Sequence, residues 1–102
     1  MTSQPAWFTT PEQRAQQQLT AWRESATVSA FQAHQALDDA GYIEQVEAMM
    51  ADPMTPVKTR RAWQMAQEFR RMSPTVLELA AAIGLTDEQV DDLFKHALTI
   101  SA

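Results

Sequence analysis

The sequence predicts an all-α protein, and three observations support that prediction. The 102-residue chain has only two glycines and very little of the β-branched alternation that marks strands. Good helix formers, namely Ala, Gln, Glu, Leu and Met, dominate it. At three places a proline follows Ser or Thr, which signals the start of a helix: Pro11, Pro56 and Pro74. We therefore expect a compact bundle of five to six short helices.

We expect a single helical domain over residues 1–102, in which 1–29 form a peripheral N-terminal arm and helix. This helix should span 12–23, with Trp7 and Phe8 before it as candidates to pack on its first turn. Its apolar stripe is narrow and consists of Ala15, Leu19 and Trp22. So little apolar surface holds a helix weakly on a core, and self-association or a partner would complete its burial.

Three more helices follow from the spacing of apolar residues along the middle of the chain. The second spans 31–40 and is closed by Gly41, and a short third spans 42–50 and ends before Pro53. The fourth is expected over 56–72. Its predicted core face consists of Ala62, Met65, Phe69 and Met72.

The C-terminal stretch 73–98 predicts two capped helices joined by a tight turn at Gly84. Ser73 is a good N-cap for the first, and Thr86 with Gln89 three residues on forms a capping box for the second. The apolar face of the last helix consists of Val90, Leu93, Phe94, Ala97 and Ile100. We expect Leu93 and Phe94 to be core residues.

The spacing around Gly84 fits a helix-turn-helix-like corner. The helix that would enter the major groove carries four carboxylates, however: Asp87, Glu88, Asp91 and Asp92. Contact with DNA phosphates needs Lys or Arg, because affinity for DNA depends on neutralising the backbone charge. We therefore expect an αα-corner used for packing, and no binding of nucleic acid.

Composition favours protein partners. The net charge is −5 and the isoelectric point is about 4.8, which disfavours nucleic acid and anionic membranes. No apolar run approaches the roughly 18 residues of a membrane helix, and the N-terminus lacks a signal-peptide profile. We expect no membrane insertion and a cytoplasmic location. With no Cys, disulfides and thiolate metal sites are excluded.

Catalytic and metal-binding patterns are missing from the sequence. The two histidines, His34 and His96, lie far apart in the chain, and neither belongs to a metal-ligand spacing. Neighbouring aspartates such as Asp91 and Asp92 point about 100° apart on a helix and cannot share a site as acid and base. No phosphate-binding glycine loop is present. We expect no enzyme activity, no cofactor and no metal.

The fourth predicted helix concentrates positive charge. It contains five of the eight basic residues: Lys58, Arg60, Arg61, Arg70 and Arg71. Together with the acidic last helix, they divide the surface charge into a positive and a negative half. Either these charges form intramolecular salt bridges on solvated faces, or they form a charge-guided docking surface.

Four residues are candidates for contact with a partner: Trp22, Arg60, Trp63 and Arg70. Tryptophan and arginine are the side chains that interfaces favour and catalytic sites do not require. For Trp22 and Trp63, core packing and interface burial both remain open. In one alternative the first helix folds back and covers Trp63.

One set of residues carries a resemblance: Gln32-Ala33, Ala36-Leu37, Ala40-Gly41, Val46, Ala62-Trp63, Phe69, Arg71, Ser73-Pro74 and the segment LAAAIGLTDEQVDDLF. Their spacing resembles that of a family of small proteins of tailed phages and prophages, which are encoded near tail or tail-fibre genes. The resemblance covers roughly residues 30–98, and residues 1–29 lie outside it. It brings no catalytic motif.

The resemblance implies a phage-encoded, non-enzymatic protein that binds other proteins, as a tail-associated structural or assembly component. The alternative is a small soluble phage factor that binds and modulates a host protein. Its partners would be phage tail or host proteins, with a homo-oligomer as a further option. The expected location is the cytoplasm of a bacterial host, with incorporation into the virion left open.

Overall fold

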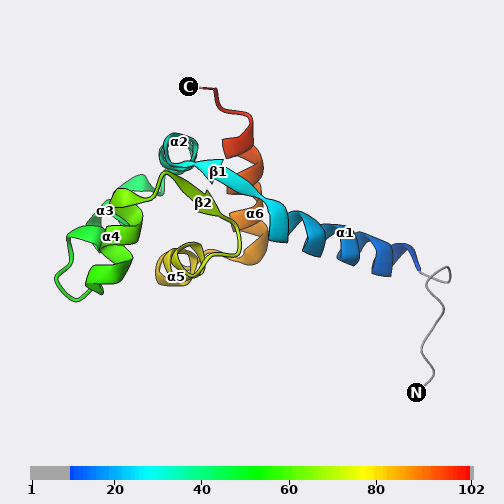
Figure 1. The fold of residues 1–102 in the computed structure, drawn as a ribbon, viewed down its shortest axis with the longest axis horizontal. Coiled ribbons are helices and arrows are strands. Elements are labelled where there is room, and N and C mark those ends of the chain that lie inside the picture. The colour runs from blue at the N-terminus through cyan, green and yellow to red at the C-terminus, as the bar shows by residue number, and fades with distance from the viewer. Residues whose placement is uncertain (1–9, 102) are drawn as a thin grey trace, which may run out of the picture.

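The computed structural model describes residues 10–101 and confirms the predicted helical fold. Trp7 and Phe8 lie outside the described residues. Within 10–101, six helices and two short strands follow one another (Figure 1): α1 (Pro11–Ser25), β1 (Thr27–Ser29), α2 (Ala30–Ala40), α3 (Ile43–Ala51), α4 (Val57–Met65), β2 (Glu68–Arg70), α5 (Pro74–Ile83) and α6 (Asp87–Leu98).

Local signals at the helix ends decide where most of these helices begin and end. Ser73 accepts the backbone N–H of Val76 at the start of α5, and Thr86 forms a capping box with Gln89 at the start of α6. Gly41 and Gly84 end α2 and α5 in the left-handed conformation, with φ of 83° and 76°. The predicted turn at Gly84 is confirmed.

The prediction of one helix over 56–72 is wrong in its second half. α4 ends at Met65, the backbone becomes extended at Ala66 with ψ of 136°, and the chain then enters β2. β2 pairs antiparallel with β1 and places Phe69 opposite Val28. The expectation of an entirely strand-free chain is therefore also wrong, because this pairing of distant segments outweighs the local preference for helix.

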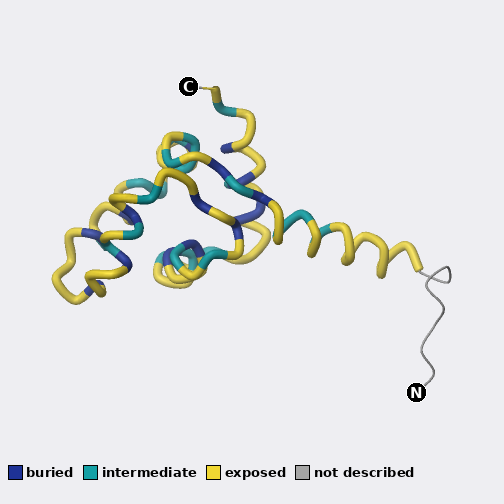
Figure 2. Tube along the Cα trace, viewed as in Figure 1, coloured by how far each residue is buried: buried dark blue, intermediate teal, exposed yellow. Residues whose placement is uncertain are grey.

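The core lies between the two-stranded ribbon and the helices α2, α5 and α6 (Figure 2). Its buried apolar members are Ala26, Val28, Ala36, Val46, Met50, Trp63, Phe69, Val76, Leu79, Val90, Phe94 and Ala97. Phe94 is buried as predicted, while Leu93 is half-buried. Met65 and Met72, which were expected on the core face of the fourth helix, are exposed.

The molecule has two ends, which are formed by different helices. Figure 1 shows α1 leaving the body on one side, while the hairpin of α3 and α4 lies on the opposite side. The hairpin is tied to α5 by a hydrogen bond of 2.7 Å from Thr59 Oγ1 to Glu78 Oε2. Among residues 10–101, no helix has the length and apolar character that crossing a membrane requires.

Candidate protein-binding surface

α1 extends away from the body and is open to solvent on its sides (Figures 1 and 2). It has 15 residues, and none of them is buried. Its N-terminus is nevertheless closed by a capping box in which the side chains of Thr10 and Gln13 each accept the other residue's backbone N–H. α1 is therefore a well-capped helix that has no packing partner along most of its length within the described chain.

The last turn of α1 is held to α6 by two contacts, the first of which involves Trp22. The indole is half-buried, and the Lys95 ammonium lies 5.4 Å from the centre of its ring. A cation at this distance from an aromatic face is attracted by the ring's electrons. Trp22 therefore packs at the base of α1, where it joins the helix to the body.

The second contact is an ion pair between Arg23 and Asp91. Arg23 Nε donates to both carboxylate oxygens at 3.1 Å, and its Nη2 donates to Asp91 Oδ2 at 2.7 Å. This forked geometry fixes direction as well as distance, because a planar guanidinium matches a planar carboxylate. The pair ties the end of α1 to the middle of α6 in one orientation.

Asp91 also binds Arg71, which follows β2. Arg71 Nε donates to Asp91 Oδ1 at 2.8 Å, and Arg71 Nη2 donates to the backbone oxygen of Asp87 at 3.2 Å. Asp91 is 4% exposed and Arg71 is 1% exposed. Asp91 is not part of the predicted apolar face of the last helix, and Arg71 was expected among the surface charges, so the burial of both corrects the prediction. Two arginines neutralise one buried carboxylate and offset the cost of burying it.

The charges of this Arg23–Asp91–Arg71 network shift its proton equilibria. Burial alone raises the pKa of the Asp91 carboxyl, but the hydrogen bonds from Arg23 and Arg71 outweigh it and leave the pKa below its ordinary value. The hydrogen bond to Asp91 raises the pKa of the Arg23 guanidinium. Both shifts favour the charged forms of Asp91 and Arg23 at neutral pH, and so favour the ion pair at the base of α1.

The four candidate residues are not brought together in one place. Trp63 is 7% exposed, and its ring stacks on His34 at 4.2 Å between centroids and lies 5.6 Å from Phe69. Core packing, which was one of the two alternatives, therefore holds for Trp63. The alternative that α1 folds back over Trp63 is wrong, because α1 points away from the body.

Arg60 and Arg70 occupy different elements. Arg60 is half-buried on α4, and its Nε is buried without a hydrogen-bond partner in the described chain. Arg70 is exposed on β2, where it lies opposite Thr27. Arg70 is thus near the base of α1, while Arg60 belongs to the far end of the molecule.

The hollow in the core offers little chemistry. A cavity of about 70 Å³ lies in the core, and all the residues that line it have apolar side chains. No acid, base or nucleophile faces it, so it has no means of activating a substrate. Within residues 10–101, no three His, Asp or Glu side chains gather as metal ligands would.

The two histidines lie in separate environments. His34 stacks on Trp63, whereas His96 Nε2 lies 2.8 Å from Asp39 Oδ2 on the surface between α2 and α6. The hydrogen bond with His96, together with a smaller contribution from Gln35, lowers the pKa of the Asp39 carboxyl. The pair links the end of α2 to α6, and it lines an open surface hollow together with Tyr42, Gln89 and Asp92.

No family model, no curated protein and no solved structure matches this chain.

The functional feature that the sequence does not reveal is the network at the base of α1. Arg23 and Asp91 are 68 residues apart, and Arg71 and Asp91 are 20 apart. Charge and helical spacing place all three side chains on solvated faces. The only signal that could have pointed to the network is the position of Asp91 directly after the buried Val90, on the edge of the apolar face of α6.

Proposed function

We propose that this protein is a non-enzymatic, phage-encoded structural or assembly component of a tail, and that it self-associates by pairing α1 with α1 of a second copy. The observation that carries the proposal is that α1 has 15 residues and buries none of them. A helix this exposed gains most of its stability from packing in an assembly, because an isolated helix of about 15 residues is marginal in water.

The spacing of the apolar residues supports pairing with another helix. Ala15, Leu19 and Trp22 are separated by four and three residues, which is the alternation of a coiled-coil seam. The seam is flanked by Gln16 and Gln18, whose side chains are polar but uncharged and so do not repel a second copy of the helix. The seam continues into the buried Ala26, and it therefore meets the body without interruption.

The charge of α1 supports a second copy as the partner. The helix carries two acids and two bases, Glu12, Arg14, Arg23 and Glu24, and so has no net charge. The whole chain has a net charge of −5. Two copies that meet body to body would repel each other, while two that meet through α1 bring together neutral surfaces.

The contacts at the base of α1 make this helix suitable for assembly. Because the Arg23–Asp91–Arg71 network and Trp22 fix the last turn, α1 is presented in one direction. A fixed arm loses less conformational entropy when it binds than a hinged one does. The phage and tail assignment rests on the resemblance of residues 30–98, and the arm adds a means by which such a component would join its neighbours.

The test is a concentration series in sedimentation velocity with three chains: wild type, Leu19→Asp and Gln17→Asp. Leu19 is in the seam, and Gln17 faces the opposite side of the same helix. We expect wild type and Gln17→Asp to dimerise as concentration rises and Leu19→Asp to stay monomeric, while all three chains melt at the same temperature at a concentration where wild type is monomeric. A wild type that is monomeric throughout, or a Leu19→Asp variant that assembles normally, overturns the proposal.

A monomeric wild type would favour the alternative function, a small phage factor that binds a host protein. The tail assignment has its own test in the neighbouring genes. Tail or tail-fibre genes beside this one support the assignment, and a neighbourhood without any phage structural gene contradicts it.

A further inference from the structure

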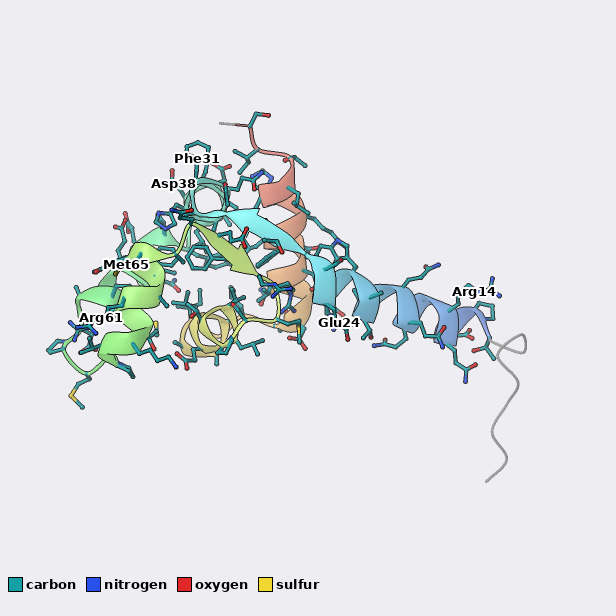
Figure 3. All side chains as sticks on the ribbon, viewed as in Figure 1. Arg14, Glu24, Phe31, Asp38, Arg61 and Met65 are labelled. Atoms are coloured by element: carbon teal, nitrogen blue, oxygen red, sulfur yellow. The ribbon has the colours of Figure 1, made fainter. Side chains whose placement is uncertain are left out.

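The outer face of α4 carries exposed apolar side chains at the end of the molecule opposite α1. Met54, just before the helix, is 86% exposed, Val57 is 51% exposed and Met65 is 75% exposed. Val57 and Met65 lie two helical turns apart with Arg61 between them, so the three share one face of α4. Figure 3 shows Met65 and Arg61 on this hairpin.

Positive charge accompanies these apolar side chains. Lys58 and Arg61 are both exposed, and neither forms an ion pair with any described residue. α4 contains no acidic residue at all. For this face, the alternative that the bases form intramolecular salt bridges is wrong: of the five bases predicted on the fourth helix, only Arg71, which lies beyond α4, forms an ion pair with a described residue.

The N-terminus of α4 adds to the positive potential. Its N-cap is Pro56, and no side chain accepts a hydrogen bond from the first-turn amides. α1, α2, α5 and α6 all begin with a Ser or Thr side chain that accepts such a bond. The free amides and the helix dipole therefore favour a carboxylate at the same end of α4 as Lys58.

We propose that this face, formed by Met54, Val57, Lys58, Arg61 and Met65, binds an acidic amphipathic helix of a partner protein. Methionine side chains adapt their shape to an apolar stripe, and the two bases with the uncapped helix end attract the acids that border it. This charge complementarity favours an acidic helix over a basic or a neutral one.

The charge of the rest of the chain favours a short protein segment over a larger polyanion. With a net charge of −5, the body repels a DNA duplex or an anionic bilayer that extends past α4. A single helix can lie on the outer face of α4 beside the exposed Lys58 and Arg61, while the Glu78 carboxylate is bound to the buried Thr59 on the side of α4 that meets α5. The face lies at the far end from α1, so this inference stands independently of self-association and would make the protein an adaptor with two contact ends.

The test uses a fluorescent amphipathic peptide of about five helical turns with leucine on one face and glutamate on the other. Its controls are a scrambled peptide of the same composition and a peptide with lysine in place of glutamate. Full-length protein is titrated into each, and fluorescence anisotropy is recorded at low and high salt. We expect binding of the glutamate peptide only, weakened by salt, with shifts of the Met54 and Met65 methyl resonances in NMR spectra.

Two variants and two matched controls locate the site. Arg61→Glu and Met65→Gln should each weaken binding at least about tenfold. Arg14→Glu on α1 and the exposed Leu98→Gln on α6 should leave binding unchanged. Equal melting temperatures for the four variants show that folding is intact.

Several outcomes overturn the inference. They are no binding of the glutamate peptide, equal binding of the scrambled peptide, and full affinity in Arg61→Glu. Tighter binding to phosphatidylserine vesicles or to duplex DNA than to the peptide also overturns it, because the partner would then belong to another chemical class.

Discussion

α1 and α6 start in the same way and end in opposite environments. Each begins with a threonine capping box, Thr10 with Gln13 and Thr86 with Gln89. α6 has 12 residues and buries four of them, including the charged Asp91, while α1 has 15 residues and buries none. A capping box therefore stabilises a helix but does not determine whether the helix packs on the core. That depends on the width of its apolar face and on whether its charged side chains find partners.

The largest difference should appear when one apolar side chain is removed from each helix. Phe94→Ala should lower the free energy of unfolding by about 4 kcal/mol, because it leaves a cavity in the core. Leu19→Ala on α1 should lower it by less than about 1 kcal/mol in the monomer. Urea unfolding at low protein concentration measures both. Similar losses for the two variants would show that α1 is packed after all.

The next test concerns the buried charge that α6 has and α1 lacks. Asp91→Asn should lower the free energy of unfolding by about 3 kcal/mol, because it leaves two guanidinium groups without a counter-charge. Asp92→Asn, at the exposed neighbouring position, is the control and should change it by less than about 0.5 kcal/mol. Equal stability of the two variants would contradict the role of the network.

The same carboxylate predicts a dependence on pH. Its pKa in the folded protein lies below that in the unfolded chain, about 3.9, so the folded state prefers the ionised form. Its contribution is complete above that unfolded value and is lost as pH falls through the folded value. The gap in unfolding free energy between wild type and Asp91→Asn should therefore close below about pH 4. A gap that persists in acid would assign the effect of the substitution to packing.

Trp22 and Trp63 give a smaller contrast between the base of α1 and the core. Trp63→Ala should strongly lower the melting temperature, because the side chain is 7% exposed, stacks on His34 and packs against the tilted ring of Phe69. Trp22→Ala should cost only about 1 to 2 kcal/mol, from partial burial and the loss of the Lys95 contact. Differential scanning calorimetry separates the two. A larger loss for Trp22→Ala would place α1 deeper in the fold than the structure does.

Features of the fold that depend on residues close together in the sequence could be predicted, whereas features that depend on residues far apart could not. The caps at Ser73 and Thr86 and the turn at Gly84 are local, and the sequence predicted them because each depends on residues within a few positions. The end of α4 at Met65 carries no such local signal. It follows from the pairing of Phe69 with Val28, which joins segments far apart in the chain.

The candidate site was also predicted only in part, because some of its features depend on contacts between residues far apart in the sequence. The weak apolar stripe of α1 was visible in Ala15, Leu19 and Trp22, and the exposed helix agrees with it. Core packing of Trp63 was one of two alternatives that stayed open. Helical spacing alone could not decide between them, because it did not show that α4 ends early or that the Trp63 ring packs against His34 and Phe69. The burial of Arg71 and Asp91 was missed, since a charged residue predicts a surface unless its partner is known.

Amide hydrogen exchange over a range of protein concentrations tests the central claim, that α1 completes its packing on a second copy. In the monomer the amides of α1 should exchange rapidly through fraying, while those of α6 exchange only on global unfolding. We expect protection of α1 to rise with concentration in wild type and in Gln17→Asp but not in Leu19→Asp, while protection in α6 changes little. Protection of α1 that is independent of concentration in all three chains would contradict it.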